Sequence, residues 1–384
     1  MKPIKLFIEA YPITEKHISG IGHMTLELIR ALEKHPDNKK TFEINLVINR
    51  DRRSSLNRWK FKSVYVKTIP LPTRLFNILW KFDLLPPMDI FLGKGAYVFP
   101  NYKNWRLLLS KSYTYVCDIS YLLFPEYVSP KNQRYLQKNI FKWVKRSCKV
   151  LAISKNAQTE IVEHLHIKKD KTLLVPCGVD VDIYYKKSST EIENFKTKYS
   201  LKKNYILYLG NIEPRKNIIR LIGAYKMLPA KLRGQYALVI VGGGGWLNEP
   251  IMKEITEAQN AGFNVIKPSV YIPDDDLPTL HSGATILVHP ALYEGFGIST
   301  LQAMACQTPV IAANNSSMPE VVGDSALLVN AEDASDISVK METLLKDKGL
   351  QQNLMKQGLK QVQRYTWDNA AKALVDGVIG NYGK

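Results

Sequence analysis

The chain has 384 residues, 45% hydrophobic and 10% aromatic, which excludes a disordered chain and suits two well-packed domains. No run approaches the ~18 apolar residues that span a bilayer, and the cysteines (Cys117, Cys148, Cys177, Cys306) lack CxxC or metal-site spacing, so we expect free thiols in a reducing cytoplasm. The net charge is +18, and residues 1–200 hold 35 Lys and Arg against 18 Asp and Glu, whereas residues 201–384 hold 18 against 17. This asymmetry favours a polyanionic partner for the first half, with solubility alone as the alternative.

Short apolar runs alternate with helical patterns along the first half. We expect strands at Ile4–Ile8, Phe42–Ile48, Val64–Val66, Ala96–Phe99, Tyr113–Val116, Val150–Ile153 and Thr172–Val175. Amphipathic helices are expected at Gly22–His35, Lys131–Lys145 and Asn156–His166. Strands separated by helices favour a parallel, doubly wound sheet.

A second series of the same kind follows the polar residues 186–191. Its strands are expected at Tyr205–Leu209, Ala237–Val241, Ala284–Val288 and Pro309–Ala312. We predict an α/β protein with one Rossmann-like domain at residues 1–185 and a second at 200–365. A last helix within residues 366–384 is expected to pack back across the first domain. Ligands of such sheets bind at the carboxyl ends of the strands.

The strand Tyr205–Leu209 is followed by Gly210-Asn211 and then by Arg215-Lys216 at an expected helix start. Glycine allows a tight turn, and a helix N-terminus favours negative charge. Cations at that position oppose the helix dipole, and a bound anion removes the conflict. This motif therefore predicts a phosphate-binding site.

A second loop, Glu294-Gly295-Phe296-Gly297, follows the strand that ends at Val288 and enters a helix near Ser299. Backbone amides there can face a phosphate, and the Glu294 carboxylate can accept hydrogen bonds from sugar hydroxyls. The position of this loop beside the basic turn predicts a pocket for a sugar diphosphate.

Both motifs, followed by Ala303-Met304-Ala305-Cys306 and Thr308-Pro309-Val310, resemble the retaining glycosyltransferases of family 4. The resemblance covers almost the whole chain, including Ser19-Gly20-Ile21-Gly22 and the Tyr271–Leu277 stretch. It implies a GT-B architecture, in which two Rossmann-like domains face each other across a cleft, and a nucleotide-sugar donor.

The resemblance also implies roles for individual residues. Arg215 and Lys216 would hold the donor diphosphate without a metal, and no other cofactor is expected. Glu294 would bind hydroxyls of the donor sugar, and Asp118 would contact the acceptor, with a strand-end cap as its alternative. Further donor contacts are implied for Gly20, Gly22, Gly210, Asn211, Tyr271, Gly295, Phe296, Gly297, Ile298 and Gln302.

Two positions depart from the family pattern. Gln302 stands where the family has a second glutamate that engages the nucleotide ribose, so we expect nucleotide binding weaker by ~1 kcal/mol. The alternative role of the Gln302 side chain is a capping box, in which it turns back to the amide of Ser299. Cys117 stands where many members have histidine, which leaves open the hypothesis that this chain is a donor-binding homologue with little or no activity.

Basic residues are interleaved with aromatic ones at Arg58–Lys62 and at Thr73–Phe82. This pattern suits an interfacial helix on anionic lipid and also a helix whose aromatic face is core. We favour core for Leu75–Phe82, and a surface role for Trp59–Lys62 and for Lys131–Lys149. The hypothesis is peripheral docking of the first domain on the inner face of the cell membrane, with a cytoplasmic location. No nucleic-acid-binding motif is present in the sequence, so no nucleic-acid partner is expected.

Together these features predict a retaining hexosyltransferase, of mannose or rhamnose type, that acts on a lipid-linked or saccharide acceptor in surface glycan assembly. The alternatives are a sugar-nucleotide-binding scaffold with little or no activity and, third, a sugar-nucleotide epimerase.

Overall fold

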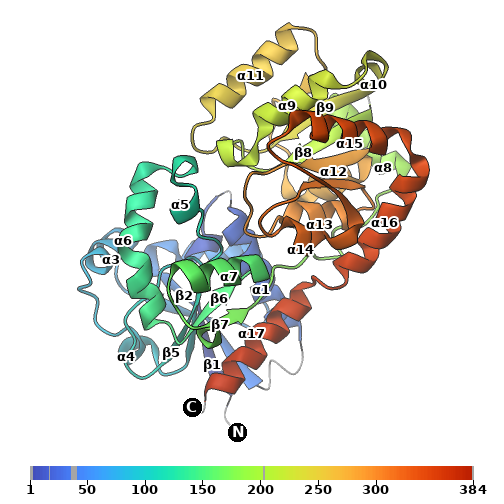
Figure 1. Cartoon of the computed structure of the whole chain (residues 1–384). Helices are drawn as coiled ribbons and strands as arrows, with labels where there is room; N and C mark the ends of the chain where they lie inside the picture. The colour runs from blue at the N-terminus through green and yellow to red at the C-terminus, as the bar shows by residue number, and fades with distance from the viewer. Residues whose placement is uncertain (1–2, 17, 36–40, 202–203, 383–384) are drawn as a thin grey trace. The chain divides into compact units, whose positions relative to one another are not determined.

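The computed structural model describes residues 3–16, 18–35, 41–201 and 204–382. Its contacts divide the chain into two compact units (Figure 1). Unit 1 comprises residues 1–119, 131–178 and 367–384, and unit 2 comprises residues 120–130 and 179–366. Residues 120–130 and 179–185 thus lie in unit 2, whereas the sequence placed them in the first domain.

Unit 1 contains a seven-stranded sheet in the order β3-β2-β1-β4-β5-β6-β7, with every pairing parallel. The strands are β1 (Ile4–Glu9), β2 (Phe42–Asn49), β3 (Tyr65–Ile69), β4 (Ala96–Phe99), β5 (Lys111–Tyr115), β6 (Lys149–Ala152) and β7 (Thr172–Leu174). Each strand expected in this half is therefore present. The order reverses between β1 and β4, as it does in doubly wound folds.

The main helices of unit 1 are α1 (Gly20–Lys34), α3 (Thr73–Lys81), α4 (Asp89–Leu92), α6 (Pro130–Arg146), α7 (Lys155–His164) and α17 (Trp367–Tyr382). The expected glycine loop is the first turn of α1, because the Ser19 hydroxyl caps the helix by accepting from the Gly22 amide at 3.4 Å. A Cβ on Gly22 would lie 2.7 Å from the Pro12 carbonyl oxygen, so this position requires glycine.

The C-terminal helix packs within unit 1, as the sequence predicted. Helix α17 contacts α1 and β7, and α1 and α17 lie side by side in Figure 1. The Lys111 ammonium donates to the Asn381 carbonyl at 2.6 Å, which fixes the end of α17 at the start of β5.

Helix α3 differs from the expectation that its apolar residues are core. Phe76 is buried, but Leu75 and Ile78 are exposed on α3, and Phe82 is exposed just beyond its end. Trp59, expected at the surface, is half-buried, and its indole N–H donates to the Ile13 carbonyl at 2.9 Å. The apolar side chains free to meet a partner are therefore partly different from those expected.

Unit 2 contains a six-stranded parallel sheet in the order β10-β9-β8-β11-β12-β13. Its strands are β8 (Asn204–Leu209), β9 (Tyr236–Val241), β10 (Val265–Ile266), β11 (Ile286–His289), β12 (Val310–Ala313) and β13 (Ala326–Val329). Its helices are α5 (Ser120–Leu123), α8 (Ser189–Lys198), α9 (Ile218–Met227), α10 (Ala230–Gln235), α11 (Glu249–Asn260), α12 (Leu277–Gly283), α13 (Ile298–Ala305), α14 (Met318–Val322), α15 (Ala334–Lys346) and α16 (Lys348–Val362).

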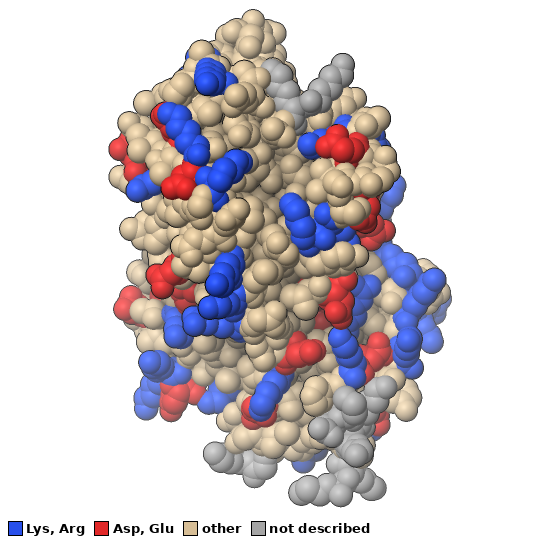
Figure 2. All heavy atoms as spheres, turned by 90° about the vertical axis from the view of Figure 1, so that its right-hand side faces the viewer, with Lys and Arg blue, Asp and Glu red and all other residues tan. Residues whose placement is uncertain are grey.

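The charge asymmetry follows the units closely. The sequence segments of unit 1 carry 33 Lys and Arg against 15 Asp and Glu, whereas those of unit 2 carry 20 against 20. The surface nevertheless has faces of mixed charge: on the face seen in Figure 2, basic and acidic side chains lie close to each other.

Candidate functional site

Two cations and a carboxylate meet at the carboxyl ends of β8 and β11. Arg215 and Lys216 lie in a three-residue 3-10 turn (Pro214–Lys216), and Glu294 lies in the loop after β11. The Lys216 ammonium contacts Oε1 of Glu294, and Nη1 of Arg215 lies 3.3 Å from Oε2. The basic turn and the glycine loop therefore face each other, as the sequence predicted.

The basic turn is held by bonds to both neighbouring loops. Arg215 donates to the Glu213 carboxylate at 2.9 Å and to the Tyr293 carbonyl at 2.6 Å. The buried Asn217 amide donates to the carbonyls of Pro290 at 2.9 Å and Ala331 at 2.6 Å. These bonds hold the basic turn against the neighbouring loops.

The cations precede helix α9 and do not lie in its first turn. Asn217, with a left-handed φ of 63°, separates the 3-10 turn from the helix, which begins at Ile218. The expected conflict with the helix dipole is therefore weaker than the sequence indicated, since the dipole acts mainly within the first turn.

Three side chains, Arg215, Lys216 and His289, contact the Glu294 carboxylate. His289, the last residue of β11, approaches Oε1 of Glu294 with Nε2 at 2.9 Å. Burial on its own raises the pKa of Glu294, but Lys216, Arg215 and His289 outweigh it and hold that pKa well below its usual value. Burial lowers the pKa of Lys216, and the Glu294 charge opposes that effect. The carboxylate is thus ionised and can accept hydrogen bonds.

Helix α13 begins directly after the glycine loop. Gly297 is its N-cap with φ 88°, and a Cβ there would lie 2.7 Å from the sulfur of Met318, so the position requires glycine. The first amides of a helix have no intrahelical acceptor, and they favour an anion at this end.

The capping box proposed for Ser299 and Gln302 is wrong. Because Gly297 is the N-cap, Ser299 lies inside the helix, and its hydroxyl is 3.5 Å from Nδ1 of His289. The half-buried Gln302 lies beside His281, whose pKa burial lowers to about 3 while Gln302 opposes that shift.

The site includes a run of four glycines, Gly242–Gly245, that the sequence reasoning missed. A Cβ on Gly242 would lie 1.8 Å from the Gly210 carbonyl oxygen, so the turns after β8 and β9 touch through their backbones. The Ile212 amide donates to the Gly243 carbonyl at 2.9 Å. Four glycines directly after a buried strand were a visible signal of such a turn.

Comparison with known proteins shows which enzymes this chain is similar to. Residues 189–361, which contain all these groups, match the model of the family described as glycosyl transferases group 1. The chain is a glycosyltransferase. The match confirms the resemblance found in the sequence.

The curated relatives include one that matches almost the whole chain. The O-antigen chain mannosyltransferase B of Escherichia coli is 29% identical over 98% of this chain and 97% of its own length. The serotype-specific mannosyltransferase WbdA of the same organism is 33% identical over 68% of this chain but only 32% of its own length, so this chain spans about a third of it. A sucrose-phosphate synthase from Thermosynechococcus elongatus has a TM-score of 0.75 over 99% of both chains at 17% identity. That likeness shows the fold, which is GT-B.

Other predicted residues of the glycosyltransferase are not among the side chains bonded in this cluster. The Tyr271 side chain is 61% exposed in the loop before α12. Gly20, Gly22 and Asp118 lie in unit 1, and the Tyr102 hydroxyl donates to the Asp118 carboxylate at 3.3 Å. Cys117 is buried, and burial raises the pKa of its thiol well above the usual value.

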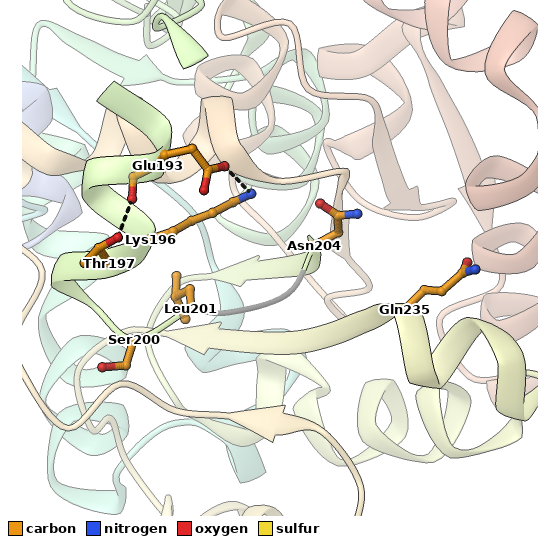
Figure 3. Close-up of a pocket in the computed structure, with 7 residues that line it drawn as sticks. All are labelled: Glu193, Lys196, Thr197, Ser200, Leu201, Asn204 and Gln235. Atoms are coloured by element: carbon orange, nitrogen blue, oxygen red, sulfur yellow. Dashed lines mark hydrogen bonds and ion pairs between the residues drawn. The ribbon is translucent and has the colours of Figure 1, made fainter. Parts of the chain in front are cut away.

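A pocket of about 500 Å³ lies elsewhere in unit 2 (Figure 3). Asn204 and Gln235 line it at the starts of β8 and β9, and the Lys196–Glu193 ion pair, at 3.1 Å, forms part of its wall. Because the strands are parallel, this pocket lies at the amino ends of the strands, whereas Arg215 lies at their carboxyl ends, so the pocket is not part of the site.

Unit 1 has its own cavity, of about 120 Å³, at the carboxyl ends of β1 and β2. It is lined by polar and aromatic side chains, including Glu9, Asn49, Asn101, Trp80 and Trp105. Burial raises the pKa of Glu9 to about 7, although the Tyr11 amide and Lys103 oppose the shift. Carboxylates, amides and indoles are groups that bind sugar hydroxyls and sugar faces.

The part of the chain that the structure describes contains no cluster of three His, Cys, Asp or Glu side chains suited to a metal ion. Within the same residues, no helix combines the length and the apolar character needed to cross a bilayer.

Proposed function

We propose that this glycosyltransferase moves a hexose, of the mannose type, from a nucleotide-sugar donor to a saccharide acceptor during surface glycan assembly. The convergence of Arg215 and Lys216 on Glu294 carries the proposal, because two cations and an ionised carboxylate meet at the carboxyl ends of β8 and β11. The full-length relative that is an O-antigen chain mannosyltransferase supports the sugar and the setting.

The donor diphosphate would lie between the basic turn and the start of α13. Arg215 and Lys216 would move from Glu294 to the phosphates, and Glu294 would accept hydrogen bonds from the sugar. Charge that grows on the leaving diphosphate would be stabilised by these two cations and by the helix amides, which requires no metal. The remaining contacts are proposed for Gly210, Asn211, Tyr271, Gly295, Phe296, Gly297, Ile298 and Gln302.

The transfer is proposed to retain the anomeric configuration. The acceptor hydroxyl would attack C1 of the sugar from the face that the diphosphate leaves. The departing phosphate oxygen would take the hydroxyl proton, so that one C–O bond breaks, another forms, and the nucleoside diphosphate carries the proton away. The cations also lower the energy of this ion-pair-like transition state.

The acceptor is proposed to bind unit 1, with its sugar at the cavity of Glu9 and Trp105 and with Asp118 as a further contact. Unit 1 carries the basic excess of the chain. A lipid-linked acceptor would then be met by peripheral attachment of this unit to the anionic inner face of the cell membrane.

Nucleotide release tests this proposal directly. Purified protein is assayed with GDP-mannose, UDP-glucose and dTDP-rhamnose, with and without a lipid-linked mannoside acceptor, in the presence of EDTA. We expect acceptor-dependent GDP release and an α-linked product by NMR. Inversion at C1 or loss of activity with EDTA would overturn those parts of the mechanism, and donor binding without turnover would favour the scaffold alternative.

A further inference from the structure

Large apolar side chains gather on one surface of unit 1, at the end of α3, on α4 and in the turn before β5. These segments lie at the left of Figure 1. Six of the side chains are more than half exposed: Phe82 62%, Leu84 66%, Ile90 55%, Phe91 69%, Leu108 66% and Leu109 59%. We name these six the apolar patch. Soluble proteins seldom leave such a group of side chains in water without a partner.

Hydrogen bonds join two of the segments that carry the apolar patch, α4 and the turn before β5. The Asp89 carboxylate, only 2% exposed, accepts from the amides of Leu108 at 2.9 Å and Leu109 at 2.6 Å. The Met88 amide donates to the Arg106 carbonyl at 2.9 Å. Within the patch, α4 and the turn before β5 are therefore held in fixed positions relative to each other.

The two acidic side chains of these segments, Asp83 and Asp89, both accept hydrogen bonds within the protein. Asp83 stands between Phe82 and Leu84, and its carboxylate accepts two bonds from the Arg146 guanidinium of α6, at 3.0 and 2.5 Å. Asp83 and Asp89 are the only acidic residues of the sequence segments 73–111 and 130–149, which contain 13 Lys and Arg. The surroundings of the apolar patch are consequently basic.

Exposed apolar side chains amid basic ones fit an anionic lipid surface, where apolar groups enter the headgroup region and cations meet the lipid charges. A second copy of this chain fits less well, because a two-fold contact would bring the same basic rim against itself. Nucleic acid would use the cations but leave the patch in water.

We propose that the apolar patch inserts into the headgroup region of an anionic bilayer, with Lys81, Lys94 and Arg106 at its rim on the lipid phosphates. This inference rests on the proposed peripheral attachment and names the surface that makes it. It replaces Trp59–Lys62, whose indole is bonded to Ile13, as the expected contact.

Vesicle flotation of the full chain tests the proposal, with phosphatidylcholine vesicles that contain or lack 30% phosphatidylglycerol. We compare wild type, Phe91→Ser/Leu108→Ser, and the control Met227→Ser/Val339→Ser, which changes two exposed apolar residues of unit 2 (each 55% exposed). The patch variant should bind at least roughly tenfold less, since each large side chain contributes through its buried apolar area. The control should match wild type, and Lys81→Gln/Lys94→Gln should lose binding only to the anionic vesicles.

The outcomes distinguish the assignment of the apolar patch from the proposal of peripheral membrane attachment itself. Thermal melting and GDP release from GDP-mannose without vesicles should be unchanged in the patch variant, which excludes misfolding. Equal flotation of the patch variant and wild type overturns the patch but leaves peripheral attachment standing. No flotation of wild type overturns both, and a dimer that the patch variant abolishes, without vesicle binding, assigns the surface to a second copy.

Discussion

Nε2 of His289 lies 2.9 Å from Oε1 of Glu294, the same oxygen that the Lys216 ammonium contacts. His289 ends β11, and the Glu294 backbone is also fixed, since its amide donates to the Ser316 hydroxyl at 3.0 Å and its carbonyl accepts from the Ser317 hydroxyl at 2.8 Å. The scaffold would therefore orient the carboxylate even if a bound donor drew the cations away. His289 acts as a positioning residue for Glu294.

Replacing His289 by alanine should lower kcat about tenfold, because one charge-assisted bond of ~1.5 kcal/mol to Glu294 is lost. His289→Gln should restore much of the activity, since its amide can still donate to the carboxylate. Steady-state kinetics with the donor varied measure the effect, and His164→Ala, at an exposed helix end, is the control. Equal activity of His289→Ala and wild type would remove the positioning role.

Arg215→Ala should reduce nucleotide release about 100- to 1,000-fold, the usual loss when one fixed donor to a developing charge is removed. The control is Lys253→Ala, a 77% exposed cation of the same unit. Because Arg215 also pairs with Glu213 and Glu294, the melting temperature should be measured alongside. Turnover at the wild-type rate would show that the guanidinium does not act on the diphosphate.

Gln302→Glu should strengthen the binding of the nucleoside diphosphate about fivefold, ~1 kcal/mol, if the side chain meets the ribose diol. A carboxylate accepts from both hydroxyls, whereas the amide offers one acceptor. Isothermal titration calorimetry with GDP measures the affinity of wild type and of Gln302→Glu. Unchanged affinity would instead assign Gln302 to its contact with His281.

Gly242→Ala should destabilise the protein by more than about 2 kcal/mol, because the new Cβ would meet the Gly210 carbonyl oxygen and force the two turns apart. Gly243→Ala is the matched control, since no heavy atom would lie within 4 Å of its Cβ. Urea unfolding measures the difference. Similar losses in both variants would show that the backbone contact is not what requires glycine.

The sequence predicted the strands well where apolar runs were long and bounded by turns. It missed β10, which has two residues, and β13 (Ala326–Val329), which starts with alanine and lies at the sheet edge. The Arg215–Lys216 and Glu294 motifs were predicted because they follow strands. His289 was missed because its partner lies five residues on, across a loop whose path sequence does not give.

The exposure of Phe82 and Phe91 could not be predicted for a physical reason. Apolar periodicity shows that a segment has an apolar face but not whether another element covers it. In α3 the face with Phe76 is covered, whereas Ile78 and the following Phe82 are 54% and 62% exposed. Only the packing of α4, α6 and the turn before β5 distinguishes these faces.

Glu9 gives a prediction about pH that separates its ionisation from its role in the cavity. Its pKa is raised from 4.5 to about 7 in the folded state, mainly by burial, so the folded protein binds this proton more tightly than the unfolded chain. The free energy of unfolding that Glu9 contributes is therefore fully present below pH ~4.5 and falls as the pH rises towards 7. Glu9→Gln removes this loss, so the variant should gain stability relative to wild type between pH 5 and pH 8 in urea unfolding. The control Glu257→Gln, at a 56% exposed carboxylate, should not gain stability, because no burial of charge is relieved.

A difference in the free energy of unfolding between wild type and Glu9→Gln that stays constant with pH would mean that Glu9 remains ionised in the folded protein. An acceptor contact would then depend on the carboxylate alone, and acceptor KM in the variant would rise equally at pH 6 and pH 8.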